Sequence, residues 1–171
     1  MRPTKYYSDR QESAIADFLG WRRTAASGAR PFEKGDLVSP EFCGECKTKT
    51  SICEKIEVRR TDWRKIGLEA QSCMRKPILF TDNGTQKTSA TFCLIQGKFC
   101  FNINPIQYRS HNESFHFKVT GTRFSVPYDI LSKVCKEVGS AVVFPEWGES
   151  LYIMSLETFR SMIGGELDGD S

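Results

Sequence analysis

The sequence predicts an α/β protein with a mixed central sheet flanked by helices. Apolar residues recur at helical spacing in several segments, and short runs rich in β-branched and aromatic residues lie between them. Gly and Pro separate the two kinds of segment. The 171 residues are enough for one domain with its own core, and 39% hydrophobic and 26% charged residues are ordinary for a globular protein.

The first predicted helix begins near Ser8, because Ser8 and Gln11 have the spacing of a capping box, and it ends near Gly20. Glu12 lies at the edge of its apolar stripe, where a carboxylate is either a rim residue or an inward-facing charge. The segment 24–36 is small, polar and interrupted by Gly and Pro, so we expect a loop there, with a short strand before it.

Two short strands are predicted at 36–39 and 42–48, joined by a turn at Pro40. On the second strand, the period of two divides the side chains between two faces. One face receives Cys43, Glu45 and Lys47, and the other receives Phe42, Gly44 and Cys46.

The rest of the chain continues the alternation of helices and strands. In order, we expect a charged connection at 49–61, a helix from Thr61 or Asp62 to about Arg75, a strand at 78–81, a hairpin of strands 90–96 and 98–104 across Gly97, a polar loop at 104–114, strands at 115–119 and 123–126, a helix at 127–138, strands at 140–146 and 150–154, and a short helix from a Ser155 cap to Met162. Residues 1–163 then form one domain, and 164–171 form a loose acidic tail.

Charge is distributed unevenly along the chain. The net charge is +3, but residues 1–136 hold 23 Lys and Arg against 14 Asp and Glu, a net of +9, whereas residues 137–171 hold one Arg against seven acids, a net of −6. A basic body suits a polyanionic partner such as DNA, because Lys and Arg displace the counterions of phosphates. Scattered, solvated surface charge is the other interpretation, and composition does not decide between them.

The expected compartment is the cytoplasm. No stretch approaches the roughly 18 apolar residues of a membrane span, and the first residues lack the apolar core of a secretory signal. The seven cysteines, an odd number, are therefore expected to be reduced thiols.

The stretch KGDLVSPEFCGECKTKT, residues 34–50, supports two competing interpretations. Cys43 and Cys46 have the C-x2-C spacing of half a structural zinc site, but no second pair of this spacing exists and a strand would send the two sulfurs to opposite faces. Alternatively, Asp36 and Glu45 meet across a hairpin as ligands of a magnesium ion, with Lys47 beside them to orient water or steady a phosphate oxygen. A non-catalytic nucleic-acid-binding module with structural zinc would follow from the first interpretation.

The order of these residues resembles the PD-(D/E)XK nuclease superfamily, and more closely its Holliday-junction-resolvase-like branch of archaeal and phage type. The likeness covers about residues 8–96: a helix bearing Glu12, the loop SGA at 27–29, KGD with Asp36, GECK with Glu45 and Lys47, and the helix and strand in TDWRKIGLEAQSCMRKPILFTD. Gly35 departs from the proline in the family signature.

The resemblance implies a restriction-endonuclease-like core and a magnesium-dependent, structure-selective DNA endonuclease, with Mn²⁺ able to substitute for Mg²⁺. Glu12, Asp36 and Glu45 would be the metal-site acids, and Lys47 would assist the attacking water. The expected substrate is branched DNA such as a four-way junction, cut by a homodimer during recombination or repair in a prokaryotic or phage-infected cell. A relative that cuts ordinary duplex DNA is the alternative.

Phosphates near such a site need cationic or hydrogen-bonding partners. The residues predicted to contact DNA lie between the first helix and Asp36: Arg22, Arg23, Ser27, Arg30 and Lys34.

Overall fold

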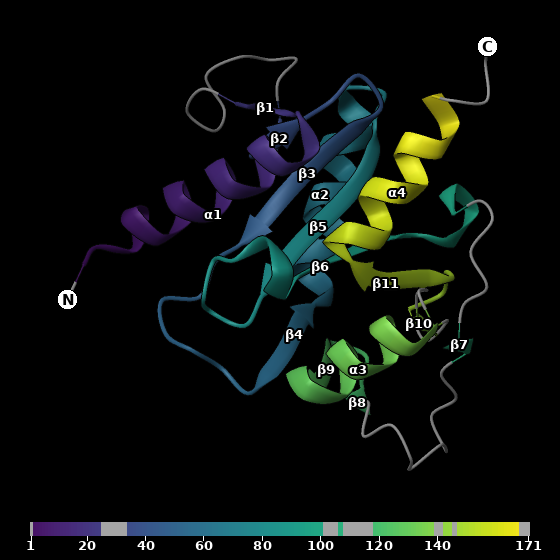
Figure 1. Ribbon diagram of the computed structural model, residues 1–171. Helices are drawn as coiled ribbons and strands as arrows, with labels where there is room; N and C mark the ends of the chain where they lie inside the picture. Colours follow the sequence, from purple (N-terminus) through teal and green to yellow (C-terminus); the bar gives the residue numbers. More distant parts are fainter. Residues whose placement is uncertain are drawn as a thin grey trace.

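The computed structural model describes residues 2–24, 34–100, 106–107, 118–138, 142–144 and 147–167. Its elements follow in the order α1 (Thr4–Leu19), β1 (Arg22–Arg23), β2 (Leu37–Val38), β3 (Phe42–Lys47), β4 (Lys55–Arg59), α2 (Arg60–Ser72), β5 (Lys76–Asp82), β6 (Thr91–Gln96), β7 (Ile106–Gln107), β8 (Lys118–Val119), β9 (Arg123–Pro127), α3 (Tyr128–Val138), β10 (Val142–Phe144), β11 (Leu151–Ser155) and α4 (Leu156–Leu167). Figure 1 shows this arrangement.

The strands form two sheets, and the larger one is mixed, as the sequence predicts. Its strand order is β1-β2-β3-β5-β6-β11-β10-β7. Strands β3 and β5 run parallel, with Glu45 beside Leu79, whereas β2 and β6 are antiparallel to their neighbours β3 and β5. Because β3 and β5 are parallel, their connection must cross over, and it contains β4 and α2. The smaller sheet has the antiparallel order β4-β9-β8.

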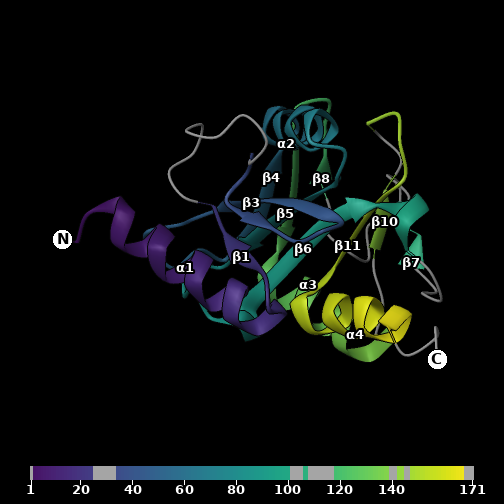
Figure 2. The ribbon, with the colours of Figure 1, turned by 90° about the horizontal axis from the view of Figure 1, so that it is seen from above.

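Helices cover both faces of the larger sheet (Figure 2). On one face, α1 and α4 pack over a core that includes Ile15, Phe42, Phe80 and Phe159. On the other, α2 packs over a second core that contains Trp63 and Ile66, and Leu131 of α3 belongs to the same core. The predicted division of side chains on β3 is confirmed, because Phe42 and Cys46 enter the first core and Cys43 enters the second.

The predicted capping box at Ser8 is wrong. Helix α1 already begins at Thr4, after the extended residue Pro3, and the Ser8 hydroxyl donates to the carbonyl of Lys5 within the helix. The predicted end is confirmed by Gly20, which closes the helix in the left-handed conformation with φ of 70°.

The predicted charged connection at 49–61 contains a strand that the sequence analysis missed. In β4, Ile56 and Val58 are buried while their charged neighbours face outward, and the strand pairs with β9. The alternation of charged and β-branched residues is a strand pattern, but the charge of the segment concealed it.

The predicted hairpin across Gly97 is also wrong in the described part of the chain. Residues Gly97–Phe99 form a turn of 3-10 helix, and β6 pairs with β5 and β11. Residues 101–105 and 108–117, which contain the remainder of that predicted strand and most of the predicted polar loop, lie outside the described residues.

Two helix ends differ from their predicted positions. Helix α2 begins at Arg60 and ends at Ser72, before the predicted Arg75, and Met74 adopts a left-handed backbone with φ of 54°. Helix α4 continues to Leu167, past Met162. Its predicted cap is confirmed, because the Ser155 hydroxyl accepts a hydrogen bond of 3.1 Å from the backbone N–H of Thr158. In the described part of the chain, no helix is long and apolar enough to cross a bilayer.

Candidate active site

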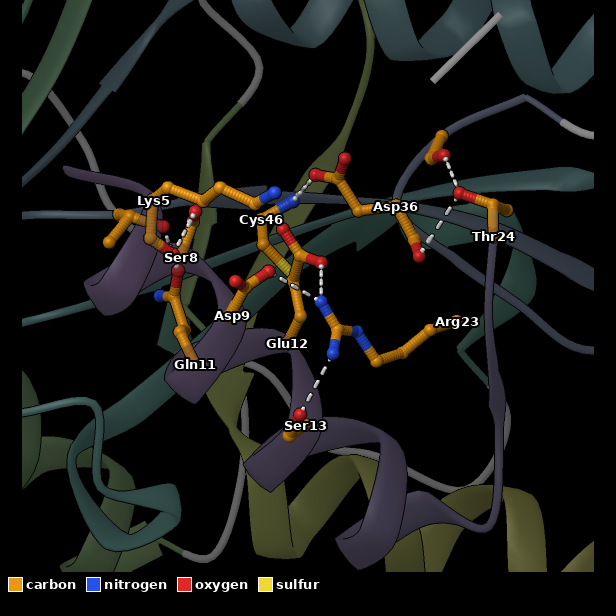
Figure 3. Close-up of polar contacts among 12 residues, drawn as sticks. Lys5, Ser8, Asp9, Gln11, Glu12, Ser13, Arg23, Thr24, Asp36 and Cys46 are labelled. Carbon is orange, nitrogen blue, oxygen red and sulfur yellow. Dashed lines mark hydrogen bonds and ion pairs between the residues drawn. The ribbon is translucent and has the colours of Figure 1, made fainter. Parts of the chain in front are cut away.

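The hairpin of β2 and β3 brings Asp36 opposite Glu45. Leu37 pairs with Gly44 in the antiparallel register, so the next residues outward along the two strands are Asp36 and Glu45. The backbone N–H of Asp36 donates to the Gly44 carbonyl at 2.7 Å. Its carboxylate accepts a 2.8 Å hydrogen bond from the backbone N–H of Cys46 (Figure 3). The charge of Glu45 acts on the Asp36 carboxyl group, so the hairpin brings the two acids near one another. Their joint binding of a metal ion stays a prediction.

Gly35, the residue before Asp36, has a backbone conformation that proline cannot adopt. Its φ is 78°, whereas the proline ring fixes φ near −65°. A Cβ on Gly35 would lie 2.6 Å from the Gly44 carbonyl oxygen. The close approach of the two strands at Asp36 therefore requires glycine at this position.

Glu45 and Lys47 lie on the same face of β3, turned toward α2. The Lys47 ammonium is 2.9 Å from Glu45 and 3.3 Å from Asp62, and the ammonium of Lys65 is 3.8 Å from Glu45. The Glu45 side chain is only 12% exposed, so this chain of alternating charges is partly shielded from water. Asp62 is a site residue that the sequence analysis considered only as a helix cap.

Glu12 reaches the same region from α1 but is held by an arginine (Figure 3). One terminal nitrogen of the Arg23 guanidinium lies 2.8 Å from Glu12 and 2.9 Å from Asp9, and the other terminal nitrogen donates to the hydroxyl of Ser13 at 3.0 Å. Arg23 therefore ties β1 to two turns of α1. The sequence analysis predicted Arg23 as a phosphate contact, and it missed these carboxylate partners.

A buried amide fixes α1 against the end of β3. Gln11 is fully buried, donates to the carbonyl of Lys47 and accepts from the hydroxyl of Thr48 at 2.6 Å. Because a buried amide without partners would be costly, these bonds set the position of α1 along the strand. Glu12, the next residue, is thereby placed near the Asp36 carboxylate.

The pKa of Asp36 is unusually high for an aspartate. Burial raises the pKa of Asp36 from the ordinary 3.8 to about 6, the negative charges of Glu45 and Glu12 add to the rise, and the hydrogen bond from Cys46 partly offsets it. The raised pKa of Asp36 therefore reflects its burial first and the neighbouring acids second.

Lys47 is strongly held in its charged form. Burial lowers the pKa of Lys47, but the hydrogen bond and charge of Glu45, together with Asp62, outweigh burial, so the pKa lies above its ordinary value. Lys47 is therefore a cationic hydrogen-bond donor at neutral pH and not a proton acceptor.

The donor chemistry of Asp36 and Glu45 fits a hard divalent cation, which prefers carboxylate oxygen and relieves repulsion between neighbouring acids. These two residues would hold it, with water and substrate oxygens completing the shell. Glu12 instead has its carboxylate turned to Arg23. Across the described ranges, no three His, Cys, Asp or Glu side chains are grouped so that they could hold a metal ion.

The remaining predicted DNA contacts are only partly described. Arg22 is exposed on β1, and Lys34 is half-buried before Gly35, with its carbonyl accepting from the Cys43 thiol at 3.0 Å. Ser27 and Arg30 lie outside the described residues.

The two cysteines of the quoted stretch are buried on opposite faces of β3, as the strand period predicts. Burial raises the pKa of the Cys43 thiol to about 12 and that of Cys46 well above its ordinary value. Thiols that stay protonated and belong to separate cores are packing residues, and they do not converge on one metal.

Comparisons with protein-family models, curated proteins and solved structures found no match to this chain.

Proposed function

We propose that the protein is a magnesium-dependent, structure-selective DNA endonuclease that resolves branched DNA such as four-way junctions. The observation that carries the proposal is the Asp36–Glu45 pair across the β2–β3 hairpin, with Lys47 on the same strand. Two acids and a lysine at the end of paired strands are suited to phosphodiester hydrolysis.

Each residue has a distinct role in the proposed reaction. A divalent cation held by Asp36 and Glu45 would supply Lewis acidity and lower the pKa of bound water. Lys47, kept cationic by Glu45 and Asp62, is suited to orient the attacking water or to steady a nonbridging phosphate oxygen. Water attacks phosphorus in line with the leaving oxygen.

Glu12 and Arg23 have a supporting role in the same proposal. Arg23 holds the Glu12 carboxylate near Asp36, where the Glu12 charge contributes to the raised pKa of Asp36. Arg22 on the neighbouring position of β1 is exposed and suited to a phosphate contact. Paired cuts across a four-way junction need two active sites, so a homodimer belongs to the proposal.

Two other functions make different predictions. A nuclease on the same fold that cuts ordinary duplex DNA would use the same residues without preference for branches. A non-catalytic module with structural zinc is disfavoured because Cys43 and Cys46 occupy separate cores.

Cleavage assays separate these functions. A labelled four-way junction and a matched linear duplex are incubated with and without Mg²⁺, using the wild type, Glu45→Gln and the control Glu54→Gln, whose side chain is exposed before β4. Symmetric, Mg²⁺-dependent cuts in the junction alone, lost only in Glu45→Gln, support the resolvase. Equal cutting of both substrates supports the duplex nuclease. Stoichiometric zinc with no cutting contradicts the enzyme.

A further inference from the structure

We propose that the outer face of the small sheet β4-β9-β8 binds the phosphate backbone of a DNA duplex arm that leads to the candidate site. This inference rests on the proposed function, because it names the surface that would hold the substrate of that site. The strands turn six polar side chains outward: Lys55, Glu57 and Arg59 on β4, Arg123 and Ser125 on β9, and Lys118 on β8. We call these six residues the basic sheet face.

The sequence of the three strands explains why this face is charged. Side chains alternate along each strand, and the inner ones on β4 and β9 are apolar and lie in the core that α2 covers: Ile56, Val58, Phe124 and Val126. The outer ones are four cations, one carboxylate and one hydroxyl group. Since a shift of one residue would bury the charges, the register is fixed and the cations face the solvent.

Two arginines lie directly opposite one another on this face. Arg59 pairs with Arg123 in the antiparallel register, and their side chains are 70% and 54% exposed. Each guanidinium has one carboxylate at 3.7 Å, from Asp62 and Glu57 respectively, and neither donates a hydrogen bond within the described residues. Like charges opposite one another are unfavourable and exposed ion pairs compensate little, so an anion that contacts both arginines would relieve the repulsion.

The basic sheet face is connected to the candidate site through α2. The Asp62 carboxylate lies 3.3 Å from the Lys47 ammonium and 3.7 Å from the Arg59 guanidinium, so one side chain separates the site from the face. The backbone N–H of Arg60 donates to the Thr122 carbonyl at 2.9 Å, which fixes the β8–β9 turn against the start of α2. Figure 2 shows β4 and β8 on the same side of β3 as α2, away from α1 and α4. A duplex on this face is therefore on the side of β3 to which Lys47 points.

The composition of the face favours a nucleic-acid backbone over a protein partner. Protein interfaces have apolar and aromatic residues at their centre, and single-stranded DNA is held by stacking on aromatic rings. The six side chains of the basic sheet face include neither kind. Phosphate contacts need only cations and hydrogen-bond donors, which position a duplex without reading its sequence.

The dimensions of the face also suit a duplex. Lys55 and Arg59 are four residues apart on β4, which is roughly 13 Å at ~3.3 Å per residue. Since each DNA strand carries one phosphate per ~3.4 Å of helix axis, the face spans about four phosphates. The cations are distributed over three neighbouring strands, so the face can contact several of these phosphates at once.

The test measures how the binding of a short labelled duplex depends on salt, in EDTA so that no magnesium-dependent cleavage occurs. Affinity is determined by fluorescence anisotropy from about 50 to 200 mM KCl. Each phosphate contact releases counterions and adds about 0.9 to the steepness of log affinity against log salt concentration. We expect Arg123→Gln combined with Lys118→Gln to reduce this steepness by about 1.8 and to weaken binding at least about tenfold at the lowest salt concentration.

A control and two further variants locate the effect. Arg160→Gln combined with Lys98→Gln removes one exposed arginine and one exposed lysine elsewhere, on α4 and beyond the end of β6 that is farther from Lys47, and should leave salt dependence and affinity unchanged. Glu57→Gln removes the carboxylate of the face and is expected to tighten binding about threefold. Circular dichroism checks folding. If the first double variant unfolds, Arg59→Gln decides the result, with an expected reduction in steepness of about 0.9.

The outcomes distinguish this inference from the proposed function. An unchanged salt dependence in the Arg123→Gln, Lys118→Gln protein, an equal change in the control, or a wild type that binds no duplex would overturn the basic sheet face. A single-stranded oligonucleotide that binds the wild type as tightly as the duplex would overturn its assignment to duplex DNA. A protein whose salt dependence falls as expected but that cuts no DNA in Mg²⁺ keeps the face and loses the nuclease. A protein that cuts DNA with an unchanged salt dependence in the double variant keeps the nuclease and loses the face.

Discussion

Removing the charge of Asp36 is expected to stabilise the fold at neutral pH while destroying the proposed activity. Asp36 is partly buried beside Glu45, and burial and that neighbouring charge raise its pKa from 3.8 to about 6. Since each pKa unit corresponds to about 1.4 kcal/mol, ionised Asp36 costs the native state about 3 kcal/mol at most. The variant Asp36→Asn lacks this cost and keeps a side-chain oxygen that can accept from the Cys46 N–H.

The sign of the pH dependence follows from the raised pKa. The unfolded chain releases the Asp36 proton near pH 3.8, whereas the native protein holds it until about pH 6. Between these values the native state binds more protons, so the contribution of Asp36 to stability falls as pH rises through this window. The full cost is present above about pH 6 and is absent below about pH 4.

Urea unfolding at about pH 4 and about pH 7.5 tests this reasoning. We expect Asp36→Asn to be more stable than the wild type at the higher pH and similar at the lower pH. Asp17→Asn, an exposed change on α1, is the control and should alter stability little. A variant that gains nothing at the higher pH, or that gains equally at both, would refute the assignment of the cost to Asp36.

Magnesium should reduce the difference in stability between Asp36→Asn and the wild type at the higher pH. A cation bound between Asp36 and Glu45 stabilises only a protein with both carboxylates. Added Mg²⁺ is therefore expected to raise the unfolding midpoint of the wild type and to leave that of Asp36→Asn unchanged. An equal rise in both proteins would mean that the ion binds elsewhere.

Three further substitutions test the framework of the site by denaturant unfolding. Arg23→Gln should lower the free energy of unfolding by about 1 kcal/mol, because it leaves Glu12 without its ion pair. If the same change at an exposed arginine lowers stability as much, Arg23 does not hold α1 against β1. Gln11→Leu should cost about 1–3 kcal/mol, since the partners of a buried amide lose their hydrogen bonds, and an unchanged midpoint would count against it. Gly35→Ala should lower the free energy of unfolding by more than about 1 kcal/mol, because the added Cβ would clash with the Gly44 carbonyl and because Gly35 has a positive φ. An unchanged unfolding midpoint would show that the hairpin adapts.

The sequence was sufficient to predict features that depend only on residues close together in the chain. The period of two on β3 correctly placed Cys43 and Cys46 on opposite faces, and the turn at Pro40 correctly joined β2 to β3 as an antiparallel pair. These inferences need only the geometry of one hairpin. The mixed α/β architecture followed in the same way from the alternation of periodicities along the chain.

The sequence was insufficient where partners are distant or where charge conceals a strand. Arg23 pairs with acids 11 and 14 positions earlier, and Lys47 pairs with Asp62 across two elements. No spacing rule identifies such pairs, because tertiary packing brings them together. Strand β4 was missed because its charged residues suggested a loop, although Ile56 and Val58 alternate with them. A count of alternating β-branched residues could have found it.

The most direct test of the central claim is magnesium-dependent cleavage of a four-way junction by the wild type, Glu45→Gln and Glu54→Gln, with folding checked by circular dichroism. We predict cleavage by the wild type and Glu54→Gln, and a loss of at least about a hundredfold in Glu45→Gln. Full activity of folded Glu45→Gln, or no cleavage by any of the three proteins, would contradict the assignment of nuclease chemistry to Asp36, Glu45 and Lys47.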